Sequence, residues 1–375
     1  MVPEVRPLLI KYLGSKRRLV PALATLAEAS AARSTLDLFT GTTRVAQAFK
    51  QLGCETVAVD RSRTSDVLAR CYIATDGADA TVAAEAAEAL AWLDQLPGEP
   101  GYVTETFCRA SRYFQPANGE RIDAIRVAIE REFAGSRLWP VLMTSLLEAA
   151  DRVDSTTGLQ MAYLKQWSDR SHQRLALRMP VLLAGSGRAV QGDACHLVGR
   201  GDLGPVDLAY LDPPYNQHRY DSNYHVWETL VAWDAPAHYG IACKRQDLRN
   251  PETRSVFNSR RTMPAALSEV IARVDAEVVV LSYNNESWLG FEELREICAS
   301  RGCVEVLAFD SARYVGARIG IHSPAGRKVG QVSHLRNTEY VVVAGPRGRV
   351  RRMTDAVADA GLGVRADRPV AVAAG

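Results

Sequence analysis

The chain has 375 residues, of which 47% are hydrophobic and 23% charged, the balance of a globular protein large enough to bury a sizeable core. The 45 Lys and Arg residues nearly balance 43 Asp and Glu, so the total charge neither requires nor excludes a nucleic-acid partner. The seven scattered cysteines form no CxxC pair, which excludes a zinc framework and indicates reduced thiols. Without a signal-peptide pattern or a membrane-length apolar run, we expect a cytoplasmic protein that binds no membrane and no metal.

Short apolar runs that end in a polar residue recur along the chain and predict buried strands of a mostly parallel sheet. In chain order they are Thr35–Phe39, Thr56–Asp60, Ala189–Asp193, Asp207–Asp212, Glu277–Tyr283, Cys303–Asp310 and Glu339–Ala344. Helical patterns separate them, most clearly at Arg44–Leu52, Ser65–Ala74 and Phe291–Ser300. This alternation predicts a doubly wound α/β fold.

Residues 76–184 are rich in Ala, Glu, Leu and Arg and show almost no strand pattern. We therefore expect a helical insertion there, within a discontinuous α/β domain of residues 1–75 and 185–345. The alternative is that its helices belong to the main domain. Residues 346–375 are expected to form a disordered tail. The amphipathic patterns of the insertion cover Thr81–Leu96, Arg121–Phe133 and Leu138–Asp151.

A glycine turn follows the first predicted strand, in the sequence TLDLFTGTTRV. Gly41 allows a ligand to approach the backbone, and the helix that opens near Thr43 offers free N–H groups to an acceptor. Asp60 ends the next strand, where a carboxylate commonly binds ribose hydroxyls. A single glycine favours a nucleoside or amino-acid site over a pyrophosphate site. The alternative is a purely structural turn, with Asp60 capping the next helix.

The run Asp212-Pro213-Pro214-Tyr215 follows a later strand. Two prolines fix the backbone and remove two N–H donors, which leaves a stiff corner with free carbonyls at a ligand-binding sheet edge. The Asp212 carboxylate and the Pro213 carbonyl could accept both N–H bonds of an adenine amine and localise its lone pair. Tyr215 could stack on the base. The alternative is an ordinary strand-ending turn.

The order FTG…DPPY, preceded by Lys11-Tyr12-Leu13-Gly14-Ser15-Lys16, resembles the Dam-like class of adenine-specific DNA methyltransferases. The resemblance implies a Rossmann-like class I methyltransferase fold and S-adenosylmethionine as cofactor. It also implies site-specific methyl transfer to N6 of an adenine flipped out of duplex DNA, with the insertion helping to recognise the target. The sequence departs from the family at Thr43 and Ser15, where glycines are usual.

The resemblance gives two sets of expected roles, and the residues that follow the catalytic motif give a third. The catalytic residues are Asp212, Pro213, Pro214 and Tyr215. The cofactor-binding residues are Tyr12, Lys16, Asp37, Phe39, Gly41, Thr42, Asp60, Asp193 and Asp212. The residues after the catalytic motif suit an extruded base or phosphates, and we assign to DNA Tyr220, Tyr224, Lys244, Arg245, Arg249 and Arg260. Alternatively, the two tyrosines pack a loop back onto the sheet, and the basic residues lie in a solvated loop. Trp227 is more typical of a core residue.

Two other functions remain open from the sequence. The same cofactor could serve an RNA adenine or a protein glutamine, although those relatives usually carry Asn in place of Asp212. The chain could also be a non-catalytic DNA-binding subunit on a methyltransferase fold. The sequence does not decide whether a restriction endonuclease accompanies it in a restriction-modification system.

Overall fold

The computed structural model describes residues 10–11, 16–215, 217, 219–312, 321–322, 328–330 and 336–369. The chain divides into two compact units. Unit 1 contains residues 1–15, 40–193 and 218–255, and unit 2 contains residues 16–39, 194–217 and 256–375. Among the helices that the structure describes, none is both long and apolar enough to cross a bilayer.

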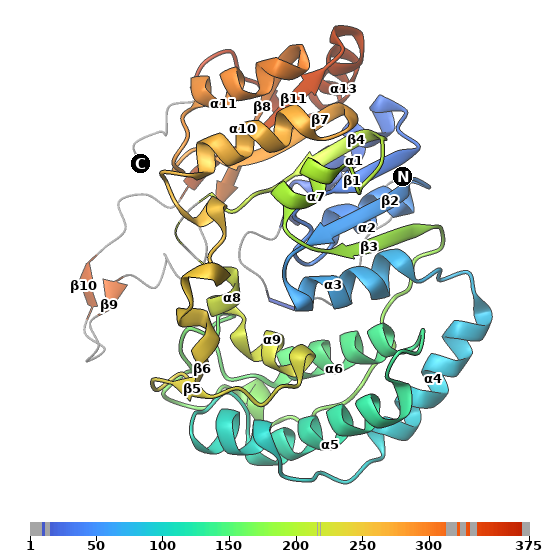
Figure 1. Cartoon of the computed structure of the whole chain (residues 1–375), viewed down its shortest axis with the longest axis vertical. Helices are drawn as coiled ribbons and strands as arrows, with labels where there is room; N and C mark the ends of the chain where they lie inside the picture. Colours follow the sequence, from blue (N-terminus) through green and yellow to red (C-terminus); the bar gives the residue numbers. More distant parts are fainter. Residues whose placement is uncertain are drawn as a thin grey trace. The chain divides into compact units, whose positions relative to one another are not determined.

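Unit 2 is built on six strands in the order β12-β8-β11-β7-β4-β1 (Figure 1). The pairs β1–β4 and β4–β7 are parallel, whereas β11 is antiparallel to both β7 and β8, and β12 is antiparallel to β8. These strands are β1 (Ser34–Asp37), β4 (Val206–Leu211), β7 (Ala276–Asn284), β8 (Cys303–Ala312), β11 (Arg336–Gly345) and β12 (Val364–Arg365). A separate two-stranded ribbon joins β9 (Ile321–His322) and β10 (Lys328–Gly330).

Two groups of helices cover this sheet on opposite faces (Figure 1). One group consists of α7 (Ala194–Arg200), α10 (Met263–Arg273) and α11 (Phe291–Cys298). The other consists of α1 (Val20–Ser30) and α13 (Arg347–Asp359), which pack on each other. Because both faces are covered, β4 and β7 are mostly apolar, as a buried parallel sheet requires.

The expectation of a disordered tail from residue 346 is wrong for most of that segment. Helix α13 buries Val350, Met353 and Val357, which recur at three- and four-residue spacing on one helical face. Strand β12 then adds to the sheet edge. The Arg-rich composition obscured this apolar stripe in the sequence.

Unit 1 contains the parallel pair β2 (Glu55–Asp60) and β3 (Gly187–Gln191), with α2 (Arg44–Gln51) and α3 (Arg63–Ala69) packed on β2. Helix α3 continues into a π-helical turn at Arg70–Ala74. The unit's remaining helices are α4 (Ala80–Asp94), α5 (Pro116–Phe133), α6 (Trp139–Val153), α8 (Tyr220–Asn223) and α9 (His225–Ala232). A short ribbon joins β5 (His238–Tyr239) and β6 (Lys244–Arg245). Helix α6 lies at the centre of the helical part, in contact with α3, α4, α5 and α9 (Figure 1).

The α/β fold and the mostly parallel sheet predicted from the sequence are confirmed. Each of the seven predicted strands exists, with ends that differ by up to three residues. The three helices predicted in the insertion also exist, as α4, α5 and α6. Unit 1 differs from the predicted insertion of 76–184, because β2, β3, α2 and α3 belong to the same compact body.

Candidate active site

The Asp212 corner closes the most buried strand of unit 2. Four of the six residues of β4 are almost completely buried, and the strand ends at Leu211. The two prolines that follow hold Asp212 and Tyr215 in fixed positions because their φ angles are locked. The Oδ1 atom of Asp212 lies 3.0 Å from the Lys16 ammonium nitrogen. The sequence-predicted carboxylate is therefore held in place by a cation of the same unit.

Lys16 is a buried ammonium group that contacts three groups of this site. Besides Asp212, its Nζ atom lies 3.6 Å from Glu339 Oε2 and 5.4 Å from the centre of the Tyr215 ring. Burial lowers the pKa of Lys16, but the Asp212 and Glu339 carboxylates outweigh burial and raise that pKa well above its ordinary value. Lys16 is therefore a permanent cation that touches both ends of the Asp212–Tyr215 motif.

Burial has the opposite effect on the Asp212 carboxyl. It raises the pKa of Asp212 to about 6, with Lys16 acting to lower it and Glu339 to raise it further. A carboxylate with this pKa is ionised at neutral pH and loses its charge in mildly acidic solution. An ionised Asp212 can accept hydrogen bonds but cannot donate one.

An aromatic contact holds the Tyr215 ring in place. Its ring meets that of Tyr283 edge to face, with centroids 5.5 Å apart. Tyr283 is a residue of β7 and is itself buried. Beneath them, the Tyr210 hydroxyl donates a hydrogen bond of 2.9 Å to the Ser282 hydroxyl. Tyr283 of β7 therefore packs against the Asp212–Tyr215 corner.

Two predicted cofactor residues of unit 2 lie at the end of β1. Asp37 is buried and pairs in register with Tyr210. Phe39 meets Phe257 edge to face at 5.1 Å. Between them, the Leu38 amide donates to the Tyr210 carbonyl, so the end of β1 is fixed to the strand that carries Asp212.

The glycine turn belongs to unit 1, where Asp60 holds it. Gly41 has a φ of 51°, and its amide donates to Asp60 Oδ2 at 2.9 Å. The Ser62 amide donates to the other oxygen, Oδ1, at the same distance. Burial raises the pKa of Asp60, while these two backbone hydrogen bonds lower it. Asp60 therefore ties the turn to the start of α3.

Thr43 stands where the resembling family carries its second glycine, and it adopts the left-handed conformation that glycine favours, with φ 63° and ψ 10°. Its hydroxyl accepts a hydrogen bond of 2.8 Å from Gln47 Nε2. A threonine thus holds a backbone conformation that glycine favours, at an energetic cost that the side-chain hydrogen bond partly offsets.

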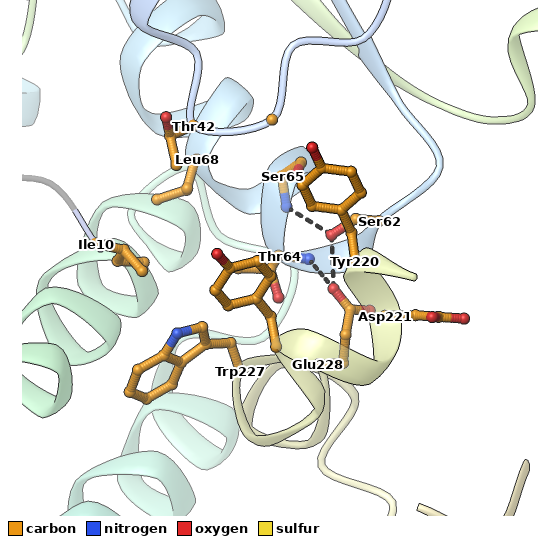
Figure 2. Close-up of a pocket in the computed structure, with 12 residues that line it drawn as sticks. Ile10, Thr42, Ser62, Thr64, Ser65, Leu68, Tyr220, Asp221, Trp227 and Glu228 are labelled. Atoms are coloured by element: carbon orange, nitrogen blue, oxygen red, sulfur yellow. Dashed lines mark hydrogen bonds between the residues drawn. The ribbon is translucent and has the colours of Figure 1, made fainter. Parts of the chain in front are cut away.

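A pocket of unit 1 opens beside this turn (Figure 2). Hydroxyl groups from the start of α3 face it, and aromatic rings from α8 and α9 form another side (Figure 2). Its lining consists of Ile10, Gly41, Thr42, Ser62, Thr64, Ser65, Leu68, Tyr220, Asp221, Tyr224, Trp227 and Glu228. Such a mixture of apolar faces with a few directed polar groups is typical of small-molecule sites.

Glu228 of α9 fixes one side of the pocket. Its Oε1 atom accepts from the Ser62 hydroxyl at 2.6 Å and from the Thr64 amide at 3.0 Å (Figure 2). Its Oε2 atom accepts from the Arg63 amide at 3.2 Å. The carboxylate thus satisfies N–H groups that the first turn of α3 would otherwise leave unpaired. Helix α9 and the pocket residues of α3 are consequently held together.

The remaining predicted site residues fall into two groups. Tyr12 lies outside the described residues, and Asp193 is half-buried two residues after β3. Of the predicted DNA contacts, Arg249 and Arg260 are exposed, and Lys244 and Tyr220 are half-buried. Tyr224 is only 3% exposed and stacks on Tyr220.

Arg245 requires a correction. It is 5% exposed, and its guanidinium binds Asp234 at 2.6 Å and Asp247 at 2.7 Å. A buried arginine with two carboxylate partners is a structural ion pair, so Arg245 is not available to a DNA phosphate. Trp227 is buried, as the sequence indicated.

Comparison with known proteins decides the family. Residues 12–297 match the family model described as D12 class N6 adenine-specific DNA methyltransferase. The chain belongs to this family. The matched range contains the Asp212 corner, the glycine turn and the whole helical part of unit 1. The resemblance stated from the sequence motifs is thereby confirmed.

The chain is also similar to proteins named as type II methyltransferases and modification methylases. The chain is 30% identical to the type II methyltransferase M.NlaIII of Neisseria lactamica over 320 residues, covering 81% of this chain and 92% of that protein. It is 28% identical to the modification methylase StsI of Streptococcus sanguinis and 27% identical to the type II methyltransferase M.FokI of Planomicrobium okeanokoites. These two matches cover 77% and 79% of this chain but only 46% and 48% of the relatives.

Family membership makes this D12-class protein an adenine-specific DNA methyltransferase, an enzyme that needs a methyl donor and DNA. The alternatives of an RNA or protein substrate and of a non-catalytic subunit are not supported. Two residues of the sites described above were missed from the sequence, namely Glu228 and Glu339. Glu339 left a signal, because it is an acid at the start of the apolar run EYVVVAG. Glu228 left none, because an acid in the first turn of a helix is common.

Proposed function

We propose that the enzyme transfers a methyl group from S-adenosylmethionine to N6 of an adenine flipped out of duplex DNA. The observation that supports this most is the rigid corner at Asp212. Its carboxylate is only 18% exposed, ionised at neutral pH and positioned by Lys16 at 3.0 Å. A group of this kind is suited to orient an amine N–H in a site from which water is excluded.

In the proposed reaction, the Asp212 carboxylate and the Pro213 carbonyl each accept a hydrogen bond from one N–H group of the adenine amine. This draws the nitrogen lone pair out of conjugation with the ring. The donor supplies an electrophilic methyl group on a sulfonium sulfur. A new C–N bond would form as the C–S bond breaks with its electrons going to sulfur, and the Asp212 carboxylate would accept the proton that the amine then loses. Tyr215 stacks on the flipped base and offsets part of the few kcal/mol that extrusion costs.

Unit 1 is proposed to hold the cofactor. The Gly41–Thr42 turn and Asp60 would bind its polar groups, and the neighbouring pocket offers the Ser62, Thr64 and Ser65 side chains. Both oxygens of Asp60 accept hydrogen bonds from backbone amides, which fixes the carboxylate where a ribose hydroxyl would be bound. Asp37, Phe39, Lys16 and Asp193 remain proposed cofactor residues, as does Tyr12.

The helical segment 76–184 is proposed to recognise the DNA target. Arg249, Arg260, Lys244 and Tyr220 are proposed DNA contacts, since a basic surface supplies the phosphate binding that precedes base recognition. The similarity to type II modification enzymes supports a place in a restriction-modification system. A matching endonuclease would then cut the same unmethylated site.

The test is transfer of tritium from methyl-labelled S-adenosylmethionine to duplex DNA, RNA and protein by the purified chain. We expect label in DNA alone, in N6-methyladenine after digestion. Asp212→Ala should abolish the label and leave the calorimetric affinity for S-adenosylhomocysteine within about threefold, because the corner contacts the amine rather than the whole cofactor. Label in RNA or protein, or near-normal transfer by Asp212→Ala, would contradict the proposal.

A further inference from the structure

Two carboxylates share one ammonium group at the Asp212 corner. Lys16 Nζ lies 3.0 Å from Asp212 Oδ1 and 3.6 Å from Glu339 Oε2, and all three side chains are less than a fifth exposed. At equal dielectric, the attraction at 3.6 Å is about 0.8 of that at 3.0 Å, since Coulomb energy varies inversely with distance. Lys16 is therefore attracted to the two acids almost equally.

Glu339 is held in a fixed position for this contact. It lies on β11 opposite Asn284 of β7, and Asn284 Nδ2 donates to Glu339 Oε1 at 3.2 Å. This hydrogen bond directs the other oxygen, Oε2, to Lys16. The neighbouring strand thus orients a carboxylate whose remaining oxygen faces the cation.

The polar groups that face Lys16 come from each neighbouring element. They are Asp212 and Tyr215 of the proline corner, Tyr210 of β4 and Glu339 of β11. Burial keeps both tyrosines protonated, because it raises the pKa of Tyr215 to about 12 and that of Tyr210 well above its usual value. The cluster therefore contains one ammonium group and two acidic side chains that lie within ion-pair distance of it.

We propose that Glu339 is a positioning residue for methyl transfer, which draws the Lys16 ammonium partly away from Asp212 so that the Asp212 carboxylate can accept the substrate amine. The inference rests on the proposed role of Asp212 and extends it. Lys16 ends in a compact ammonium group on a flexible side chain. Its distances to the two acceptors are 3.0 and 3.6 Å, so a small movement of the ammonium group changes which acceptor is nearer. Without Glu339, Asp212 is the sole carboxylate partner of Lys16 among the described residues.

The same arrangement affects the charge of Asp212. Burial raises the pKa of Asp212, Lys16 lowers it, and Glu339 raises it. Removal of the Glu339 charge should therefore lower the Asp212 pKa and strengthen the Lys16–Asp212 contact. Activity should survive to lower pH, but the maximal rate should fall, because the amine must then displace a more tightly bound ammonium.

The experiment compares steady-state methylation by the full-length wild type, Glu339→Gln and Glu339→Asp. Glu292→Gln is the matched control, since Glu292 is an exposed acid in the first turn of α11. For Glu339→Gln we expect kcat to fall about tenfold, with KM for DNA and Kd for S-adenosylhomocysteine changed less than about twofold. The acid limb of its kcat profile should move down by about half a pH unit. Glu339→Asp keeps the charge on a shorter side chain, so its kcat should lie between those of the wild type and Glu339→Gln.

A merely structural role for Glu339 would change stability or binding without moving the acid limb. Wild-type kcat and an unmoved acid limb in Glu339→Gln would overturn the inference, as would equal losses in the Glu292→Gln control. Should Glu339→Gln fail to fold, Glu339→Asp decides by the same criteria. A wild-type enzyme that transfers no methyl group to DNA would instead refute the proposed function, and this inference with it.

Discussion

The Oδ2 atom of Asp60 accepts a hydrogen bond of 2.9 Å from the backbone N–H of Gly41. The acid that ends β2 is thus joined to the turn after β1 along the chain, 19 residues earlier. Asp60 thus has a structural role beside its proposed role in binding the cofactor. The two duties are separable by mutation, because an amide retains the shape of the side chain but not its charge.

Substitution of Asp60 should weaken cofactor binding in a graded way. Asp60→Ala removes both backbone contacts and should raise Kd for S-adenosylhomocysteine more than about tenfold. Asp60→Asn keeps one acceptor but turns an N–H group toward the other backbone amide, so a loss of about tenfold or less is expected. Titration calorimetry measures both, and unchanged affinity in Asp60→Ala would remove Asp60 from the cofactor site.

Glu228 should stabilise the pocket side of α3. Glu228→Ala leaves the Ser62 hydroxyl and two amides without their carboxylate, so we expect a loss of about 1–3 kcal/mol in the free energy of unfolding. Glu228→Gln should lose less, because one amide oxygen remains as acceptor. The exposed Glu88 of α4 supplies the control, Glu88→Ala. Equal urea midpoints for Glu228→Ala and Glu88→Ala would contradict this account of the clamp.

The basic residues that follow the Asp212 corner should fall into two classes, those that bind DNA phosphates and those that stabilise the fold. Arg249→Ala and Arg260→Ala should each reduce the slope of log K for DNA against log salt by about 0.9, as expected for one lost phosphate contact. Arg245→Ala should leave this slope unchanged and lower stability by roughly 1–3 kcal/mol, since its acidic partners are about half exposed. Fluorescence anisotropy over a salt series distinguishes them. A reduced slope in Arg245→Ala would restore it as a DNA contact.

Thr43 offers a test of the departure from the family's glycine turn. Thr43→Gly relieves about 1–2 kcal/mol of left-handed strain, but it loses the hydrogen bond from Gln47 and gains unfolded-state entropy. These effects nearly cancel, so we expect a change within about 1 kcal/mol. Thr43→Val keeps the strain and loses the hydrogen bond, and should destabilise by about 1–2 kcal/mol. A urea unfolding curve in which Thr43→Val matches the wild type would show that the hydroxyl contributes nothing.

The sequence predicted the strands and the rigid corner at Asp212 well because both depend on local signals. Apolar runs such as Asp207–Leu211 and the two prolines at 213 and 214 constrain the backbone whatever surrounds them. Helix α13 was missed because exposed charged residues surround its apolar stripe. They are Arg347, Arg351, Arg352, Asp355 and Asp359. Arg245 was misread because the carboxylates that bind it are identified only by the fold around it.

The roles of Glu228 and Glu339 could not be predicted for a related reason. Glu339 is separated from Lys16 by more than 300 residues, and Glu228 from Ser62 by 166. Contacts at such separations depend on the strand order and on helix packing. The motif resemblance supplied Asp60 and Asp212, but it assigned no role to the acids that position their neighbours.

The most direct test of the central claim is long-read sequencing of DNA from cells that express either the wild type or Asp212→Ala. The account predicts N6-methyladenine at one recurrent sequence with the wild type, and none above background with the variant. Methylated cytosine in place of adenine, or the same adenine mark from Asp212→Ala, would contradict it.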